Sequence, residues 1–123
     1  MQSLISKSKL FLRSDGTYVR DYLYVDDVVD GYIRIAKNLK KVKGEAFNFG
    51  SNKSYSVLAL IKLFEKLARQ QIPYKILNTA ANEIPYQHLA YDKAKKMLGW
   101  EPVASFASTY KDIREWYTHF YSS

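Results

Sequence analysis

One arginine carries the clearest chemistry in this sequence. Arg20 follows a Ser-Asp-Gly turn at residues 14–16 and lies in a segment that is otherwise aromatic and apolar. A guanidinium can hold a diphosphate through two parallel hydrogen bonds, a geometry that a lysine ammonium does not offer. The same side chain could instead pair with Asp15 or Asp21 on a strand face, where an exposed ion pair contributes little to stability. The residue types alone leave both interpretations open.

Several kinds of catalytic and cofactor site have no support in the sequence. Glycine occurs at positions 16, 31, 44, 50 and 99, a spacing that contains neither the G-x-G-x-x-G dinucleotide turn nor a P-loop. The chain has no cysteine, and its two histidines, His88 and His119, are too far apart to share a metal-ligand motif. No serine lies in a G-x-S-x-G setting. We therefore expect no catalytic, cofactor-binding or metal-binding residue in this chain.

Tyr91 and Lys95 match a Tyr-x-x-x-Lys pattern, in which a helix can place an ammonium beside a phenol. Asp92 is the expected start of that helix, so Tyr91 would lie before the first turn. In a chain with eleven tyrosines and many lysines, one chance match is expected. We interpret these residues as a helix start followed by a solvated lysine face.

Short strands and helices alternate along the chain, which predicts one α/β domain, of a small α+β-like type, over residues 1–123. β-Branched and aromatic residues favour a strand around Arg20, and helical spacing with capping residues predicts about four helices. The expected strands are 18–25, 45–49 and 74–77. The expected helices start at Asp26 or Asp27, at Ser56, at Asp92 and near Ser105. The helix from Asp26 or Asp27 is expected to end at Gly44, and the helix from Asp92 at Gly99.

Apolar residues at helical spacing predict which helix faces point into the core. The helix after Ser56 has the widest such face. In the other two long helices, the residues expected to point inward are Val28, Val29, Tyr32, Ile35, Ala36 and Leu39, and then Phe106, Tyr110, Ile113, Trp116, Tyr117 and Phe120.

Composition and charge narrow the class of partner. The 123 residues are 47% hydrophobic and 25% charged, as in ordinary globular domains, and no apolar run reaches the roughly 18 residues of a membrane span. We expect a cytoplasmic protein with no membrane partner. The net charge of +7 favours anionic ligands. One alternative is a basic interaction module that binds nucleic acid or another polyanion through Lys37, Lys40, Lys41, Lys43, Lys93, Lys95 and Lys96, although many aromatic residues fall at core spacing rather than at stacking positions.

Three sequence blocks occur in a fixed order. They are R-S-D-G-T-Y-V-R-D-Y-L-Y-V-D-D at 13–27, G-E-A-F-N-F-G at 44–50, and K-A at 93–94 followed by L-G-W-E-P at 98–102. Their order and spacing resemble the C-terminal half of the extended short-chain dehydrogenase/reductases that act on nucleotide sugars, the NAD-dependent epimerase/dehydratase family. The stretch N-E-I-P-Y-Q-H-L at 82–89 is most similar to the CDP-glucose 4,6-dehydratase branch. The resemblance covers about residues 10–120.

The resemblance implies a substrate-binding region with the fold of the C-terminal part of an extended Rossmann-fold enzyme. It implies that Arg20 contacts the diphosphate of a nucleotide sugar and that Glu83 lies near the nucleotide ribose. Gln87 and His88 lie in the same stretch and are expected to bind substrate too. Many relatives carry a second diphosphate-binding arginine where this chain has Ala80, which leaves the diphosphate with fewer matched cations.

The resemblance also implies what the chain lacks. In the family, an N-terminal Rossmann domain binds NAD(P) and carries the catalytic Tyr-x-x-x-Lys, so we expect that domain to be absent here and Tyr91 and Lys95 to be structural. We expect a fragment of a dehydratase or epimerase that is inactive alone and holds no cofactor itself. Its expected partners are the nucleotide sugar and either the missing Rossmann half or a second copy, through apolar surface left exposed.

Overall fold

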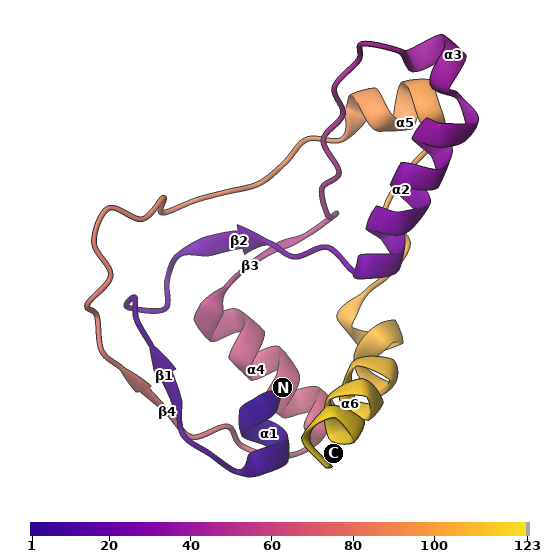
Figure 1. Cartoon of the computed structure of the whole chain (residues 1–123). Helices are drawn as coiled ribbons and strands as arrows, with labels where there is room; N and C mark the ends of the chain where they lie inside the picture. The colour runs from indigo at the N-terminus through magenta and orange to yellow at the C-terminus, as the bar shows by residue number, and fades with distance from the viewer. Residues whose placement is uncertain (123) are drawn as a thin grey trace.

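The computed structural model describes residues 1–122, in which six helices and four short strands alternate (Figure 1). This pattern confirms the α/β class. The helix count exceeds the expected four because two short helices form in the N-terminal segment and in the lysine-rich segment. The elements are α1 (Gln2–Ser6), β1 (Leu10–Leu12), β2 (Val19–Asp21), α2 (Val25–Lys37), α3 (Leu39–Val42), β3 (Ser54–Ser56), α4 (Val57–Ala68), β4 (Tyr74–Ile76), α5 (Asp92–Leu98) and α6 (Phe106–Ser122).

The strands form two separate two-stranded sheets within the described residues. β1 and β4 pair in parallel, with Leu10 opposite Tyr74. β2 and β3 pair antiparallel, with Arg20 opposite Tyr55. A long segment leaves β4, passes the outer side of β2 and reaches α5 (Figure 1). This segment carries Glu83, and β2 carries Arg20, so the two pieces of the predicted site come from distant parts of the chain.

One hydrophobic core lies beneath the β1–β4 sheet. Leu4, Leu12, Ile61 and Ile72 are buried together, from α1, β1, α4 and the turn before β4. α4 begins where the sequence predicts, because the Ser56 hydroxyl accepts a hydrogen bond from the Ala59 amide at 3.2 Å and caps the helix. The apolar face of α4 is thereby turned onto β1.

A second core joins α3, α5 and the segment after α5. Val42, Ala94, Leu98 and Trp100 are buried there, and Trp100 is fully enclosed. α5 ends as predicted, because Gly99 adopts the left-handed conformation (φ 64°) that closes a helix. The turn at Gly99 places the Trp100 ring in this second core, against Ala94 and Leu98.

The expected strand at 45–49 does not form, and the expected strand at 18–25 is ladder-paired only at Val19–Asp21. A strand requires a neighbour with which to exchange backbone hydrogen bonds, and the described residues offer none to segment 45–49. The segment packs instead on α2. A Cβ at Gly31 would lie 2.6 Å from the Phe49 ring, so the ring rests directly on the helix backbone.

The start of α2 also differs from the prediction. Neither Asp26 nor Asp27 caps the helix; Tyr24 occupies the cap position and makes no side-chain cap hydrogen bond. The Asp27 carboxylate is buried and accepts hydrogen bonds from the backbone amides of Val103 (3.3 Å) and Ala104 (3.1 Å). Long-range partners have therefore replaced the local capping role.

Several residues expected to point inward are exposed. On α2, Val29 is 47% exposed and Tyr32 65%, and on α6, Trp116 is 57% exposed and Phe120 58%. The helical periodicity is correct, but the described residues place no element over these faces. Leu39 and Ala36 are exposed as well.

Candidate functional site

Arg20 and Glu83 form the centre of the candidate site. The Arg20 guanidinium donates to the carbonyl oxygens of Val19 (2.9 Å) and Ile84 (2.6 Å) and to the Glu83 carboxylate (3.3 Å). It also lies 5.8 Å from the centre of the Tyr18 ring, within cation–π range. The two charged side chains are 27% and 33% exposed. The guanidinium is thus held in place by neutral partners while its charge remains accessible.

The segment that carries Glu83 is fastened to β2 by backbone hydrogen bonds. Val19 donates to the carbonyl of Pro85 at 2.9 Å, and Gln87 donates to the carbonyl of Val19 at 3.1 Å. Both bonds are made by Val19, the residue before Arg20. The structure therefore brings Arg20, Glu83 and the Gln87 backbone together, whereas the Gln87 residue itself is exposed.

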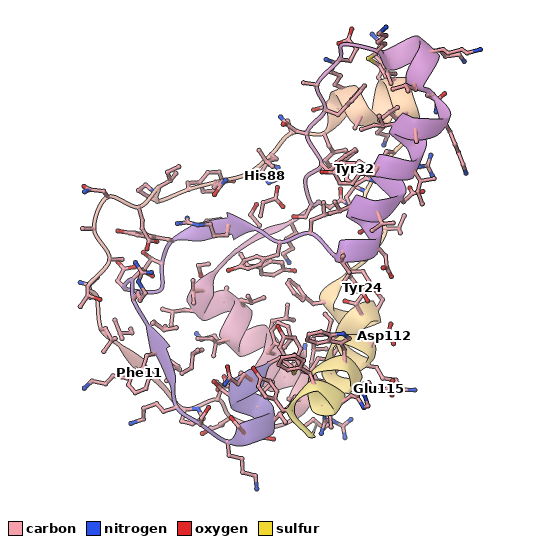
Figure 2. All side chains as sticks on the ribbon, in the orientation of Figure 1. Phe11, Tyr24, Tyr32, His88, Asp112 and Glu115 are labelled. Carbon is pink, nitrogen blue, oxygen red and sulfur yellow. The ribbon has the colours of Figure 1, made fainter. Side chains whose placement is uncertain are left out.

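His88 lies one residue further along this segment (Figure 2). Its Nδ1 atom is 2.8 Å from the Ser54 hydroxyl of β3 and 3.5 Å from a carboxylate oxygen of Asp21. His88 thus contacts residues of β2 and β3. Its contact on β2 is Asp21, the neighbour of Arg20.

Position 80, where the chain departs from the family pattern, lies against another arginine. The Ala80 amide donates to the carbonyl of Arg13 at 2.9 Å, and the Thr79 amide donates to the same oxygen at 2.6 Å. Arg13 is exposed. The positively charged Arg13 is therefore the residue to which the Ala80 backbone is hydrogen-bonded.

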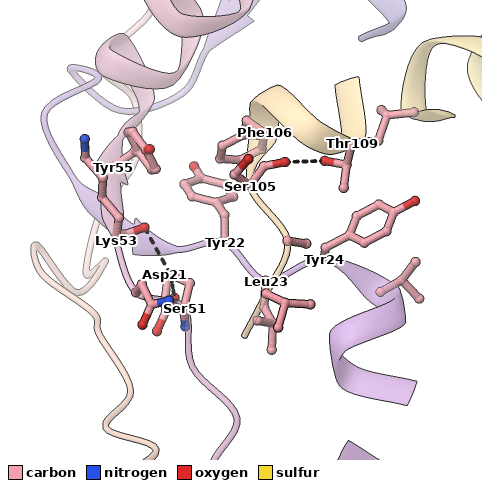
Figure 3. A pocket seen from close by; sticks show the side chains of 15 residues that line it. Asp21, Tyr22, Leu23, Tyr24, Ser51, Lys53, Tyr55, Ser105, Phe106 and Thr109 are labelled. Carbon is pink, nitrogen blue, oxygen red and sulfur yellow. Dashed lines mark hydrogen bonds between the residues drawn. The ribbon is translucent and has the colours of Figure 1, made fainter. Parts of the chain in front are cut away.

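A cavity of about 650 Å³ lies next to this site but does not include Arg20 or Glu83 (Figure 3). Aromatic rings dominate one wall, where Tyr22 and Tyr55 pack edge to face on Phe106 at 6.1 and 5.6 Å. Burial raises the pKa of the Tyr22 phenol, and the positive charge of Arg20 opposes this shift. Asp21 and Ser51 lie at the polar end of the cavity. Sequence reasoning did not assign Asp21 to the site, although it directly follows Arg20.

The residues of the Tyr-x-x-x-Lys pattern have structural partners. The Tyr91 phenol donates to the Asn52 side chain, and its ring packs edge to face on Trp100 at 5.6 Å. The Lys95 ammonium pairs with Glu101 at 2.6 Å, and this hydrogen bond raises the pKa of Lys95. Lys93 likewise pairs with Glu45 at 2.7 Å. Two lysines of the proposed polyanion-binding set are thus engaged with carboxylates.

Neither a metal centre nor a membrane span is found in the described part of the chain. Between residues 1 and 122, no three His, Asp or Glu residues gather in a way that could hold a metal ion. None of the helices in the same range combines the length and apolar character needed to cross a membrane.

The class of protein follows from comparison with known families. Residues 2–50, which include Arg20 and the whole of α2, match the model of the NAD dependent epimerase/dehydratase family. Two of the relatives described next are at least 34% identical over more than two thirds of the chain, so the chain belongs to this family, and its fold matches part of the extended short-chain dehydrogenase/reductase fold. The match agrees with the resemblance of the three sequence blocks.

Individual relatives are nucleotide-sugar epimerases. The chain is 34% identical over 103 residues to UDP-glucose 4-epimerase of Bacillus subtilis. The matched region covers 83% of this chain and 30% of that protein. The chain is 38% identical over 87 residues to the Bifidobacterium longum enzyme, spanning 71% of this chain and 26% of that protein. The solved structure of the Bifidobacterium longum enzyme with NAD+ and UDP superposes with a TM-score of 0.78 at 30% identity, covering 86% of this chain and 34% of that one.

A second solved structure gives the same picture. UDP-glucuronic acid 4-epimerase from Bacillus cereus, in complex with UDP-glucuronic acid and NAD, superposes with a TM-score of 0.80 at 25% identity, covering 87% of this chain and 34% of that one. The chain thus spans about a third or less of the proteins that it matches. These relatives are UDP-sugar epimerases, whereas the sequence pointed first to the CDP-glucose 4,6-dehydratase branch. The nucleotide-sugar family is favoured over a polyanion-binding module.

Proposed function

We propose that this chain is the nucleotide-sugar-binding region of an NAD-dependent epimerase or dehydratase. The observation that carries the proposal is the half-buried pair of Arg20 and Glu83, made by β2 and the segment between β4 and α5. The carbonyl oxygens of Val19 and Ile84 fix the orientation of the Arg20 guanidinium, so its remaining N–H donors are positioned for a diphosphate. The partly solvated contact with Glu83 contributes little by itself, so a ligand can replace it.

The chemistry of a nucleotide diphosphate fits this pair. The diphosphate oxygens are anionic acceptors and satisfy the Arg20 guanidinium in place of Glu83. The released Glu83 carboxylate is an acceptor for ribose hydroxyl groups. Gln87 and His88, from the same segment, would complete the surface around the nucleotide. Arg13, next to Ala80, is a second cation that could reach the diphosphate.

For the base, we propose cytosine, because segment 82–89 is most similar to the CDP-glucose 4,6-dehydratase branch. The UDP-sugar epimerases named above favour uracil instead. The two bases differ at C4, where cytosine carries an amine donor and uracil a carbonyl acceptor, and at N3, which accepts in cytosine and donates in uracil. Competition between CDP and UDP therefore decides between them: tighter CDP supports the dehydratase branch, and tighter UDP the epimerases.

Titration calorimetry of the chain with CDP at low salt tests the diphosphate site. Arg20→Ala should weaken binding about 10- to 100-fold, as expected for a lost charge-assisted hydrogen bond of about 1.5–3 kcal/mol. Arg114→Ala, which removes one positive charge from the exposed face of α6, is the matched control and should change the affinity less than twofold. Equal affinity of Arg20→Ala and the parent, or no binding by either, would refute the proposal.

The hydride chemistry requires residues that this chain does not offer. NAD accompanies the solved relatives, but the five glycines of the chain form no turn for its diphosphate. We therefore assign NAD to the full-length enzyme and none of the present residues to it. Incubation of the pure chain with NAD and a CDP-sugar should yield no 4-keto product, and a measurable product would contradict this assignment.

The proposed region also needs a partner surface. The exposed apolar face of α2 lies beside the unpaired extended segment 45–49. A Rossmann half would cover such a face and supply a strand to pair with the segment. We propose that half as the natural partner, with a second copy of the chain as its substitute.

A further inference from the structure

Asp21 lies next to Arg20 on β2 but makes a different set of contacts. Its side chain is only 7% exposed. One carboxylate oxygen accepts the Ser51 amide at 2.8 Å and the Ser51 hydroxyl. The other accepts the Leu89 amide at 3.0 Å. A buried carboxylate therefore links β2, the turn after Phe49 and the segment that carries Glu83.

β2, the turn after Phe49 and the segment that carries Glu83 also come together at Gly50. A Cβ added to Gly50 would overlap the carbonyl oxygen of Leu89 and would lie 3.1 Å from the Asp21 carboxylate. Only a residue without a side chain lets the turn approach the Leu89 backbone so closely. Gly50 and Asp21 thus fix the position of Leu89 from two sides.

His88 adds a third link at this point. Its Nδ1 atom contacts the Ser54 hydroxyl of β3 at 2.8 Å and lies 3.5 Å from Asp21. The nearby chain is already tied to β2 through the Val19–Gln87 backbone bond. Residues 83–89 are consequently fastened at the Glu83 end by Arg20 and at the Leu89 end by Asp21.

We propose that Asp21 is a positioning residue of the nucleotide-sugar site: it holds the backbone of residues 83–89 against β2 when a ligand displaces the Glu83 carboxylate from Arg20. The inference rests on the proposed function and deepens it. Ligand binding removes the Arg20–Glu83 contact, so the segment is then held by its backbone bonds to Val19, by the Arg20–Ile84 bond and, at its far end, by Asp21.

A carboxylate suits this role better than an amide. Asp21 receives hydrogen bonds at both oxygens, and every partner is a donor. In Asp21→Asn one oxygen becomes an NH2 group, which faces a donor and cannot accept. The side chain keeps its shape, so the variant removes the anchor with little change in packing.

Amide hydrogen exchange of the ligand-free chain, followed by NMR, tests the anchor itself. Asp21→Asn should speed exchange at Leu89 and Gln87 about tenfold, while Ile61 in the α4 core stays unchanged. Asp112→Asn on α6 removes the same charge and should leave both amides as in the parent. Unchanged exchange at Leu89 in Asp21→Asn would overturn the proposal.

Affinity for CDP, measured by calorimetry, tests whether the anchor serves the site. Asp21→Asn should weaken binding about five- to tenfold in the parent background and less than twofold when Glu83→Gln is already present, because Asp21 acts through that segment. A merely structural role would give equal losses in both backgrounds and would overturn the proposal. Failure of the parent to bind CDP would instead refute the proposed function, so the two failures are distinguishable.

Two milder variants keep the test decisive if Asp21→Asn does not fold. Ser51→Ala removes one hydroxyl donor, so the Asp21 carboxylate is held less firmly against the Leu89 amide. Gly50→Ala adds a methyl group that displaces the Leu89 carbonyl with no change in charge. Both should speed Leu89 exchange and weaken CDP binding, Gly50→Ala more strongly; a folded Gly50→Ala with parental exchange and affinity would overturn the proposal.

Discussion

At the scale of single residues, two buried aspartates organise the molecule through distant backbone amides. Asp21 accepts from Ser51 and Leu89, and Asp27 accepts from Val103 and Ala104. The sequence analysis gave these aspartates local roles only: Asp21 as one possible partner of Arg20 on a strand face, and Asp27 as one of two candidate helix caps. Their actual partners are 30 or more positions away, which local patterns do not reveal.

Asp27 gives a stability prediction at this scale. Asp27→Ala would leave two backbone amides without an acceptor, so we expect the free energy of unfolding to fall by about 1–3 kcal/mol. Asp26→Ala, at the neighbouring exposed position, loses only an interaction with the helix dipole and should cost under about 1 kcal/mol. Chemical denaturation of both variants makes the comparison, and equal losses would show that the long-range bonds of Asp27 contribute nothing.

At the scale of elements, local signals were sufficient at the start of α4 and the end of α5, but insufficient at the start of α2 and for strands. The Ser56 cap and the Gly99 stop are confirmed because each depends on neighbours within a few residues. Segment 45–49 has the composition of a strand, but a strand also needs a partner, and that information lies outside the segment. Only the family resemblance predicted that Arg20 and Glu83 serve one ligand, as diphosphate and ribose contacts, because 63 positions separate the two residues.

The packing of Phe49 on α2 gives a prediction that helix propensity alone would get wrong. Alanine normally stabilises a helix interior relative to glycine by about 1 kcal/mol. At Gly31, however, the new methyl group would meet the Phe49 ring at 2.6 Å, so we expect Gly31→Ala to lower the free energy of unfolding by about 1–3 kcal/mol. Thermal and urea unfolding test this. A gain in stability would show that Phe49 does not rest on the helix.

At the scale of the whole molecule, the apolar surface is unevenly distributed. Val25, Val29 and Tyr32 are exposed together on α2, while the net charge of +7 disfavours close approach of two copies at low salt. The fold class and the family were predictable because they depend on patterns along the whole chain. The exposed faces were not, because periodicity shows that a face is apolar without showing what covers it.

Self-association is the expected result of this surface. Light scattering at physiological salt should show dimers or larger species at high concentration, since screening leaves the apolar face of α2 free to pair. The double variant Val29→Ser and Tyr32→Ser should shift the chain toward monomer, whereas Trp116→Ser on α6 should not. A parent that stays monomeric at all concentrations would contradict the expectation.

The central claim is that a nucleotide diphosphate binds between β2 and the segment after β4. An NMR titration of the labelled chain with CDP tests it most directly, because it reports every residue at once. We predict the largest shift changes at the Arg20 guanidinium and the amides of residues 83–89, saturating together. Changes confined to the lysines of α3 and α5, or no saturable changes, would contradict the account.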